Sequence, residues 1–297
     1  MNAGRSDRLF SALQRCLPTR ALSTLVFRLT QIRTIWFKNA LIRLFQRHYA
    51  IDLGDAEHPH PEDYPSFNAF FTRALKPGAR PLPQDPALLV SPVDGTVSQC
   101  ASICGGRLIQ AKGHDYSAQE LLGGEAELTA RFNGGSFCTL YLAPHNYHRI
   151  HMPVDGRLVA WRHVSGRLFS VNPATARTMP NLFARNERLV AEFETESGPL
   201  VLVLVGALFV GGLETVWAGQ VSPPHRRGTE IAHYRLIQPL TFARGAELGR
   251  FNMGSTVILL AAPSALAWLP DCVSGRRMSM GQALARRTLH QMPHKPA

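Results

Sequence analysis

A small polar step, Gly254-Ser255-Thr256, lies between a polar loop and the apolar run from Val257 to Ala262. The pattern predicts that Ser255 stands at the mouth of a buried strand, beside a glycine whose carbonyl carbon is sterically open. A hydroxyl in that setting could attack a substrate, or it could attack the peptide bond that precedes it. Gly-Ser-Thr also occurs in many turns, so a purely structural turn is the alternative.

Three histidines, His145, His148 and His151, fall within seven residues. The proline that precedes them predicts a helical turn over 144–149, followed by a strand from Ile150. In one continuous strand His148 and His151 would point to opposite faces, whereas a turn between them would let both face one pocket. Solvated histidines in a surface loop are the alternative.

An aspartate could complete an activated hydroxyl. Serine is a weak nucleophile unless a histidine takes its proton and a carboxylate supports the imidazolium. Ser255, His151 and Asp94 supply these groups, and Asp155 is the other candidate carboxylate. No Gly-x-Ser-x-Gly elbow surrounds Ser255, which argues against an ordinary α/β-hydrolase. Zinc held by histidines and an aspartate is a further alternative, but no metalloprotease motif supports it and no metal is expected.

Positive charge is concentrated at the N-terminal end of the 297-residue chain, whose net charge is +11. Residues 1–50 hold nine Lys/Arg and one acid (+8), and the remaining residues hold 23 basic and 20 acidic side chains (+3). Apolar spacing predicts amphipathic helices over 8–49, with basic residues on their other faces. Such helices are typical of binding to anionic membranes. A hairpin packed on the body and a nucleic-acid site are the alternatives, and the interleaved aromatic side chains argue against nucleic acid.

The rest of the chain predicts an α+β protein whose body is mainly an antiparallel β barrel or sandwich. We divide it into a membrane-association segment (1–50), a linker with a short helix capped by Ser66 (51–86), and a catalytic domain (87–297). A Pro-Val-Asp-Gly sequence occurs twice, each time before a strand. The predicted strands are Leu88–Val90, Thr96–Cys100, Leu108–Ala111, Phe137–Leu142, Ile150–Met152, Leu158–His163, Leu189–Thr195, Leu200–Val205, Glu214–Val221 and Val257–Ala261.

Five cysteines form no paired framework, and no second pair accompanies Cys100 and Cys104 to complete a zinc site. We expect reduced thiols in a cytosolic compartment. The longest apolar run, 199–213, is shorter than the ~20 residues of a membrane span, and no signal peptide is expected. Residues 290–297 are expected to form a loose tail.

Seven segments in this order resemble the bacterial, pyruvoyl-dependent phosphatidylserine decarboxylases, and the resemblance covers most of the chain. The family usually has leucine where Met253 precedes the Gly-Ser-Thr step, an apolar exchange that should leave the chemistry unaffected. The segments are Phe67-Asn68-Ala69-Phe70-Phe71-Thr72-Arg73, Ser91-Pro92-Val93-Asp94-Gly95, Lys112-Gly113-His114-Asp115-Tyr116-Ser117, Tyr147-His148-Arg149-Ile150-His151-Met152-Pro153, Asn181-Leu182-Phe183-Ala184-Arg185-Asn186-Glu187-Arg188, Glu214-Thr215-Val216-Trp217-Ala218-Gly219 and Met253-Gly254-Ser255-Thr256.

The resemblance implies that the chain cuts itself between Gly254 and Ser255, giving a β chain (1–254) and an α chain (255–297). Ser255, deprotonated by His151 with Asp94 behind it, would attack the Gly254 carbonyl and end as a covalent pyruvoyl group. That group would serve as the electron sink for converting phosphatidylserine to phosphatidylethanolamine and CO₂. His148 is the candidate for the protonation step or for holding the carboxylate.

The implied partners are phosphatidylserine in a bilayer, an anionic membrane surface bound by residues 1–50, and the two chains of one precursor. A homodimer is left open, and no nucleic acid is expected. The implied location is peripheral, on the cytoplasmic face of the inner membrane. The alternatives are a membrane-associated serine hydrolase using Asp94, His151 and Ser255, and a non-enzymatic β-barrel adaptor tethered by the helices.

Overall fold

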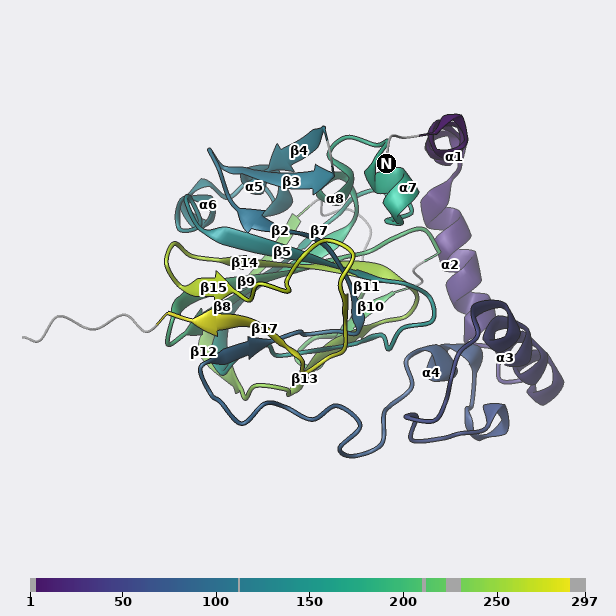
Figure 1. The fold of residues 1–297 in the computed structure, drawn as a ribbon. Coiled ribbons are helices and arrows are strands. Elements are labelled where there is room, and N and C mark those ends of the chain that lie inside the picture. The colour runs from purple at the N-terminus through teal and green to yellow at the C-terminus, as the bar shows by residue number, and fades with distance from the viewer. Residues whose placement is uncertain (1–3, 112, 210–211, 223–230, 289–297) are drawn as a thin grey trace, which may run out of the picture.

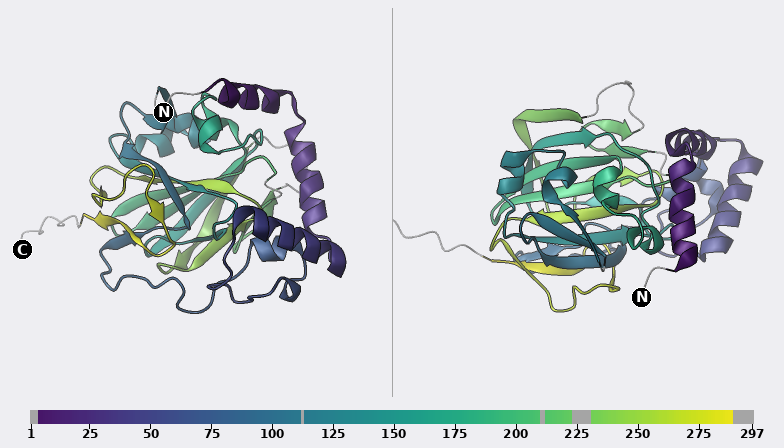
Figure 2. Two further views of the ribbon diagram at one scale, coloured as in Figure 1. Left: turned by 45° about the vertical axis from the view of Figure 1, so that its right-hand side comes forward. Right: turned by 90° about the horizontal axis from the view of Figure 1, so that it is seen from above.

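The computed structural model describes residues 4–111, 113–209, 212–222 and 231–288, so the predicted tail at 290–297 lies outside the described residues. Three longer helices begin the chain and stand along one side of a β-rich body (Figures 1 and 2). The helices are α1 (Arg5–Cys16), α2 (Thr19–Thr30), α3 (Ile35–Tyr49), the 3-10 turn η1 (Pro61–Asp63), α4 (Phe67–Phe71), α5 (Ala118–Leu121), α6 (Ala126–Ala130), α7 (Pro173–Ala176) and α8 (Leu182–Arg185).

The body is built on an eight-stranded sheet in which every neighbouring pair is antiparallel. Its strands, in spatial order, are β12 (Ile231–Phe242), β7 (Gly156–Val164), β8 (Arg188–Thr195), β9 (Gly198–Val205), β14 (Ser255–Ala261), β5 (Ser136–Leu142), β2 (Gly95–Ser102) and β16 (Arg277–Met278). The smaller sheets are β11 (Gly219–Ser222), β10 (Leu213–Thr215), β13 (Glu247–Phe251) and β6 (Arg149–His151); β1 (Leu88–Val90), β17 (Ala283–Arg287) and β15 (Leu266–Trp268); and β3 (Arg107–Ala111) with β4 (His114–Ser117).

Strand β14 lies at the centre of this architecture. It pairs with β9 on one side and β5 on the other, and all seven of its residues are buried. Its apolar side chains belong to a core cluster that also takes in Phe251 of β13 and Ile150 of β6. The four-stranded sheet therefore packs against the large sheet, and its strand β6 ends at His151.

The N-terminal helices are amphipathic in the reverse sense from that of a core helix. In α1 and α2 the buried residues are polar, and three of them, Ser11, Gln14 and Ser23, hydrogen-bond to the body. Gln14 Oε1 accepts from Ser170 N at 2.7 Å, and Ser23 Oγ accepts from Phe209 N at 3.1 Å. The large apolar side chains that these helices leave exposed are Leu9, Phe10, Leu13, Leu25, Leu29, Ile35, Trp36 and Leu44.

Helix α3 is joined to the body by the segment that follows it. Ile42 is fully buried in a second cluster with Phe67, Phe70 and Phe71, and the Phe45 ring packs 5.1 Å from that of Phe67. The short helix predicted after Ser66 is confirmed as α4, with the Ser66 hydroxyl accepting from Ala69 N at 3.2 Å. α4 thus couples the N-terminal helices to the loop that carries Arg73.

The α+β class and the antiparallel sheets are confirmed, but the barrel alternative is wrong. Among the described strands the large sheet is open, with β12 and β16 as its edges. The predicted strand Glu214–Val221 is in fact two strands, β10 and β11, paired around a turn that lets Ala218 N donate to Thr215 Oγ1. The predicted helical turn over 144–149 is a single tight turn closed by Asn146 N to Ala143 O, and the strand begins at Arg149.

Candidate active site

Ser255 is the first residue of β14 and has no exposed surface. Its register opposite Leu142 of β5 fixes its backbone, and Gly254 just before it has no side chain to block the carbonyl carbon. The Ser255 hydroxyl has no hydrogen-bond partner among the described residues. A buried hydroxyl without a partner is costly, so such an atom marks a place where chemistry or a ligand is expected.

His148 lies close to the Gly254–Ser255 peptide bond. A methyl group built on Gly254 would lie 3.9 Å from His148 Nε2. His148 Nδ1 is 2.8 Å from the Asn146 carbonyl oxygen and must donate to it, so Nε2 carries the lone pair. That Nε2 is buried and has no hydrogen-bond partner within the described part of the chain. Burial, helped by the nearby Arg73 charge, lowers the His148 pKa to about 3, so the ring is a neutral proton acceptor at pH 7.

The walls around His148 exclude water. Its ring packs on Phe71, with ring centroids 4.1 Å apart, and its exposed fraction is 0%. Its backbone carbonyl accepts from Phe251 N at 3.0 Å, which ties the histidine to the chain four residues before Ser255. The Phe71 contact holds the ring, and the hydrogen bond from Phe251, next to the pairing of β6 with β13, holds its backbone.

His151 lies at the end of β6 and is held differently. Its Nδ1 donates to the Gly245 carbonyl oxygen at 2.8 Å, so Nε2 accepts from the Tyr147 hydroxyl at 2.9 Å. Burial lowers the His151 pKa, and the ring is neutral at pH 7. Both candidate histidines are therefore proton acceptors, but Nε2 is free in His148 and already engaged in His151.

Asp94 is buried. The hydrogen bond from His151 N to the Pro92 carbonyl oxygen, 2.8 Å long, holds the segment that carries Asp94 beside His151. The two carboxylate oxygens of Asp94 accept from Arg80, at 3.0 and 2.7 Å, and Oδ1 also accepts from Met280 N at 2.7 Å. The described hydrogen bonds thus bring Asp94 next to His151 without joining the two side chains, and they do not join either to Ser255. Asp155 is directed elsewhere, accepting from Arg244 N at 2.7 Å.

Arg73 belongs to the site but has no role in the sequence analysis. It is 6% exposed, and its Nη1 has no partner among the described residues. Its Nη2 donates to the His145 carbonyl at 3.4 Å, its guanidinium lies over the Phe70 ring, and its charge acts on His148. Burial lowers the Arg73 pKa without neutralising the group. The apolar run that precedes Arg73 in the sequence was the available signal, since it predicts burial of its neighbour.

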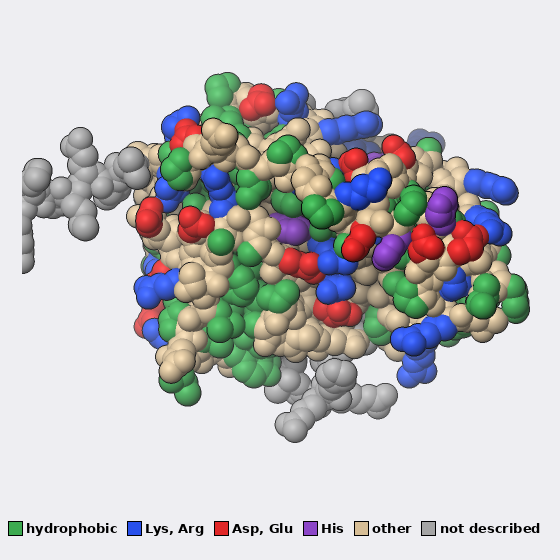
Figure 3. Space-filling model, turned by 90° about the horizontal axis from the view of Figure 1, so that it is seen from below, with side chains coloured by type: hydrophobic (Ala, Val, Ile, Leu, Met, Phe, Trp, Pro, Cys, Tyr) green, Lys and Arg blue, Asp and Glu red, His purple; other side chains and the backbone are tan. Residues whose placement is uncertain are grey.

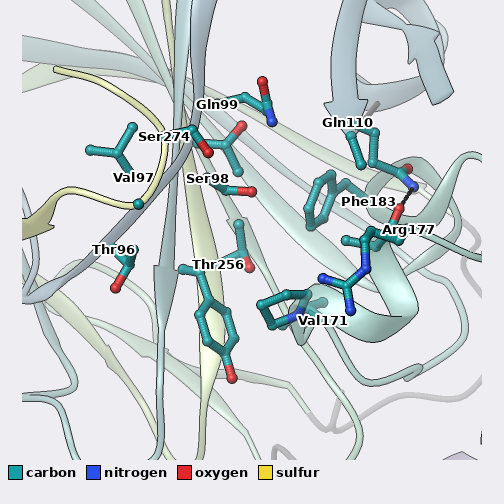
Figure 4. A pocket seen from close by; sticks show the side chains of 16 residues that line it. Thr96, Val97, Ser98, Gln99, Gln110, Val171, Arg177, Phe183, Thr256 and Ser274 are labelled. Carbon is teal, nitrogen blue, oxygen red and sulfur yellow. Dashed lines mark hydrogen bonds between the residues drawn. The ribbon is translucent and has the colours of Figure 1, made fainter. Parts of the chain in front are cut away.

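On the other face of β14 lies a cavity of about 450 Å³. Thr256 lines it, because successive side chains of a strand alternate between faces. Figure 4 shows Thr256 and Ser98 on one side of the hollow, with Arg177 and Phe183 across from them. His148 lies beside Gly254 and is not among the residues that line this cavity, so the cavity adjoins the site without including that histidine.

Fold and site together define an α+β protein in which an antiparallel sheet buries a Gly-Ser bond beside a neutral histidine. A family model described as phosphatidylserine decarboxylase matches residues 67–286, and a second, described as PSD, matches residues 9–50. The chain is 50% identical over 280 residues to the phosphatidylserine decarboxylase proenzyme of Nitrosococcus oceani, covering 94% of this chain and 92% of that one. For the proenzymes of Methylococcus capsulatus and Shewanella baltica the identities are 50% and 51%, over 93% and 94% of this chain and 96% and 97% of theirs.

The chain therefore belongs to the phosphatidylserine decarboxylase family. The resemblance drawn from its motifs is confirmed, and the match extends across the N-terminal helices as well as the body.

Proposed function

We propose that this chain is the proenzyme of a phosphatidylserine decarboxylase, which converts phosphatidylserine to phosphatidylethanolamine and CO₂ after cutting itself at Gly254-Ser255. Identity of 50% over most of the chain to proenzymes of that name is the observation that carries the activity. A buried serine hydroxyl with no described partner, preceded by an open glycine carbonyl, supports the position of the cut.

The self-cleavage is assigned to Ser255, His151 and Asp94. Ser255 Oγ attacks the Gly254 carbonyl carbon, the amide becomes an ester, and β-elimination separates residues 1–254 from residues 255–297. His151 receives the serine proton at Nε2, which requires that atom to exchange its bond with Tyr147. Asp94 stabilises the imidazolium by its charge, which already acts to raise the His151 pKa against the larger effect of burial.

The site fits a pyruvoyl group at position 255. His148 Nε2 is a buried acceptor beside Gly254 with no described partner, so it is available to the groups that react at position 255. A pyruvoyl group would supply an electron sink for the bond that breaks on loss of CO₂. His148 takes up a proton at Nε2 when the substrate amine reacts, and returns it to the substrate carbon. Phe71 and the buried setting keep water from competing for that carbon.

Arg73 is assigned to the substrate's anionic groups. Its unpartnered Nη1 can donate to the serine carboxylate or to the phosphodiester, and burial strengthens such a bond. A buried guanidinium beside a neutral imidazole suits a headgroup that carries a carboxylate, a phosphodiester and an amine, since the anionic groups and the reacting amine are met by different side chains.

A lipid substrate requires the enzyme to meet the bilayer, and the N-terminal helices are assigned to that surface. Among the described residues no helix has the length and apolar character to span a membrane. The exposed apolar side chains of α1–α3 would insert at the headgroup level while the basic side chains meet anionic lipid. Figure 3 shows hydrophobic and basic side chains side by side at the end of the molecule where α3 lies. We place the enzyme as a peripheral protein on the cytoplasmic face of the inner membrane.

Intact-mass spectrometry combined with a CO₂-release assay tests the proposal. Wild-type protein should give two masses, with the C-terminal chain beginning in a ketone, and should decarboxylate phosphatidylserine. Ser255→Ala should give one uncut mass and no CO₂. A single wild-type mass that reacts with a fluorophosphonate probe would instead indicate a serine hydrolase.

Two matched variants test the assignment of the carboxylate. Asp94→Asn should leave the chain uncut. Asp155→Asn should still be processed, because the Asp155 carboxylate accepts a hydrogen bond from Arg244 N. The reverse result would exchange their roles. His148→Ala should still be cut but should release no CO₂, and failure to cut would make His148 the cleavage base.

A further inference from the structure

Three cysteine thiols from separate segments converge on one edge of the large sheet. Cys100 in β2 is the direct antiparallel partner of Cys138 in β5, and Cys272 reaches them from the loop after β15. Their sulfur atoms all lie within 4.8 Å of one another. The Cys272 sulfur is 3.1 Å from that of Cys100 and 3.9 Å from that of Cys138. Cys104, which is four residues from Cys100 in the sequence, is exposed and does not belong to this cluster.

The spacing of the cluster suits soft metal coordination. Metal–sulfur bonds of about 2.3 Å in a tetrahedral thiolate site place sulfur atoms about 3.8 Å apart. The Cys138–Cys272 distance of 3.9 Å already has this value, and Cys100 would move outward by less than about 1 Å. A disulfide would need one pair to close to about 2 Å and would leave the third thiol alone.

The surroundings of the cluster also favour a cation. Cys138 and Cys272 are buried and Cys100 is half-buried, so an ion could enter from the Cys100 side and keep a solvent ligand there. The Cys272 sulfur lies within hydrogen-bond reach of both other sulfur atoms, so three donors of one kind already face a common centre. Thiolate donors select zinc and copper(I) over hard cations.

We propose that Cys100, Cys138 and Cys272 bind one thiophilic d¹⁰ metal ion, Zn²⁺ in the first instance, with water as the fourth ligand. Binding displaces the thiol protons, so affinity rises with pH. Because Cys100 and Cys138 precede the cleavage point and Cys272 follows it, the ion also ties the two chains of the mature enzyme together. This second role rests on the proposed self-cleavage, whereas the metal site itself does not.

Titration of reduced, metal-free protein with Cd²⁺ under anaerobic conditions tests the site. Full-length wild type and the uncut Ser255→Ala variant should each take up one ion per chain, with thiolate-to-metal charge-transfer absorption. Cys272→Ser should weaken binding by about 100-fold or more, since a thiolate ligand is lost. Cys104→Ser, which alters an exposed thiol four residues from Cys100, should bind as wild type does. No uptake by wild type, equal binding by the two serine variants, or a disulfide within the cluster would overturn the site.

Urea-driven separation of residues 255–297 from the cleaved protein tests the tie. Zn²⁺ should raise the urea concentration at which the chains separate in wild type and leave it unchanged in Cys272→Ser. If Zn²⁺ changes chain separation equally in wild type and Cys272→Ser, or if wild type is never cleaved, the proposal that the ion links the two chains is wrong. Cd²⁺ uptake by Ser255→Ala decides the metal site in either case, so the failure of one proposal is distinguishable from that of the other.

Discussion

The N-terminal helices and the β body treat apolar side chains in opposite ways. In β14 every residue is buried, and its leucines lie in the common core. In α1 and α2 the buried residues include Gln14 and Ser23, while Leu9 is 73% exposed. The body gains its stability by removing apolar surface from water, whereas the helices are fixed to it by hydrogen bonds and leave their apolar surface in water. The exposed apolar side chains of the helices can therefore be buried against a second surface, which we propose is the bilayer.

Helix α3 shows the change from one behaviour to the other. One side buries Ile42 against α4, and the other exposes Trp36 at 74% and Leu44 at 65%. Because α4 leads directly to Arg73, the helix that would touch lipid is packed on the segment that would hold the lipid headgroup. The comparison thus links the outer surface to the site through one small aromatic cluster.

The largest expected effect separates the regions by stability. In the uncut Ser255→Ala background, Leu259→Ala should lower the free energy of unfolding by about 2–5 kcal/mol, because it leaves a cavity beside β14. Leu9→Ala should change it by less than about 0.5 kcal/mol. Urea unfolding measures both. Equal losses would mean that Leu9 is packed in solution and would remove the contrast.

The next effect concerns the outward face of the helices. Trp36→Glu and Leu44→Glu should each weaken sedimentation with phosphatidylserine vesicles by roughly 30-fold, since each removes about 2 kcal/mol of apolar insertion. Ile237→Glu is the matched control, because Ile237 is 99% exposed on β12 of the body. If the control loses binding as the helix variants do, the membrane-facing surface is not the one assigned here.

A third prediction concerns the body and its buried imidazole. The folded-state pKa of His148 is about 3, below the ordinary value of 6.5. Between these two pH values the imidazole is protonated in the unfolded chain and neutral in the folded chain. Stability should fall as pH drops through that window, by about 1.4 kcal/mol per pH unit from this group. His148→Gln in the uncut background should reduce the slope of unfolding free energy between pH 6 and pH 4. Identical slopes would show that His148 is accessible to protons in the folded state.

The smallest effect tests the inward face of α1. Gln14→Leu places an apolar residue at a buried position, yet it should lower stability by about 1–2 kcal/mol, because Ser170 N loses its acceptor. Leu13→Gln on the outward face should leave unfolding nearly unchanged while reducing vesicle binding. Stabilisation by Gln14→Leu in urea unfolding would show that α1 docks by apolar burial after all.

Sequence pattern predicted the local elements well where the apolar content was high. The runs that became β9 and β14 are rich in valine and leucine, and both strands formed where alternation or burial placed them. It missed β17, whose sequence Ala-Leu-Ala-Arg-Arg has little β propensity and forms a strand by pairing with β1 and β15. It also merged β10 and β11, although Gly219, whose φ is 64°, was the available sign of the tight turn at Ala218.

For the site, the sequence located the residues but not their partners. The sequence named His151 as the base for cleavage and His148 for protonation, yet the fold leaves Nε2 of His148 without a described partner and engages that of His151. Arg73 lies far from both histidines in the sequence, so its approach to them depends on how α4 packs. The difference arises because hydrogen-bond partners are set by long-range contacts, which local pattern does not encode.

The sequence by itself determined that a serine follows a glycine at the start of a buried strand, and that the first fifty residues form basic amphipathic helices. Periodicity and composition are local properties, and local backbone preference follows them. Only the tertiary structure decided that the apolar stripe of those helices faces outward, and that Cys272 meets Cys100 and Cys138 across the cleavage point. Those outcomes depend on which surfaces are complementary once the sheet has formed, and complementarity is a property of the packed chain as a whole.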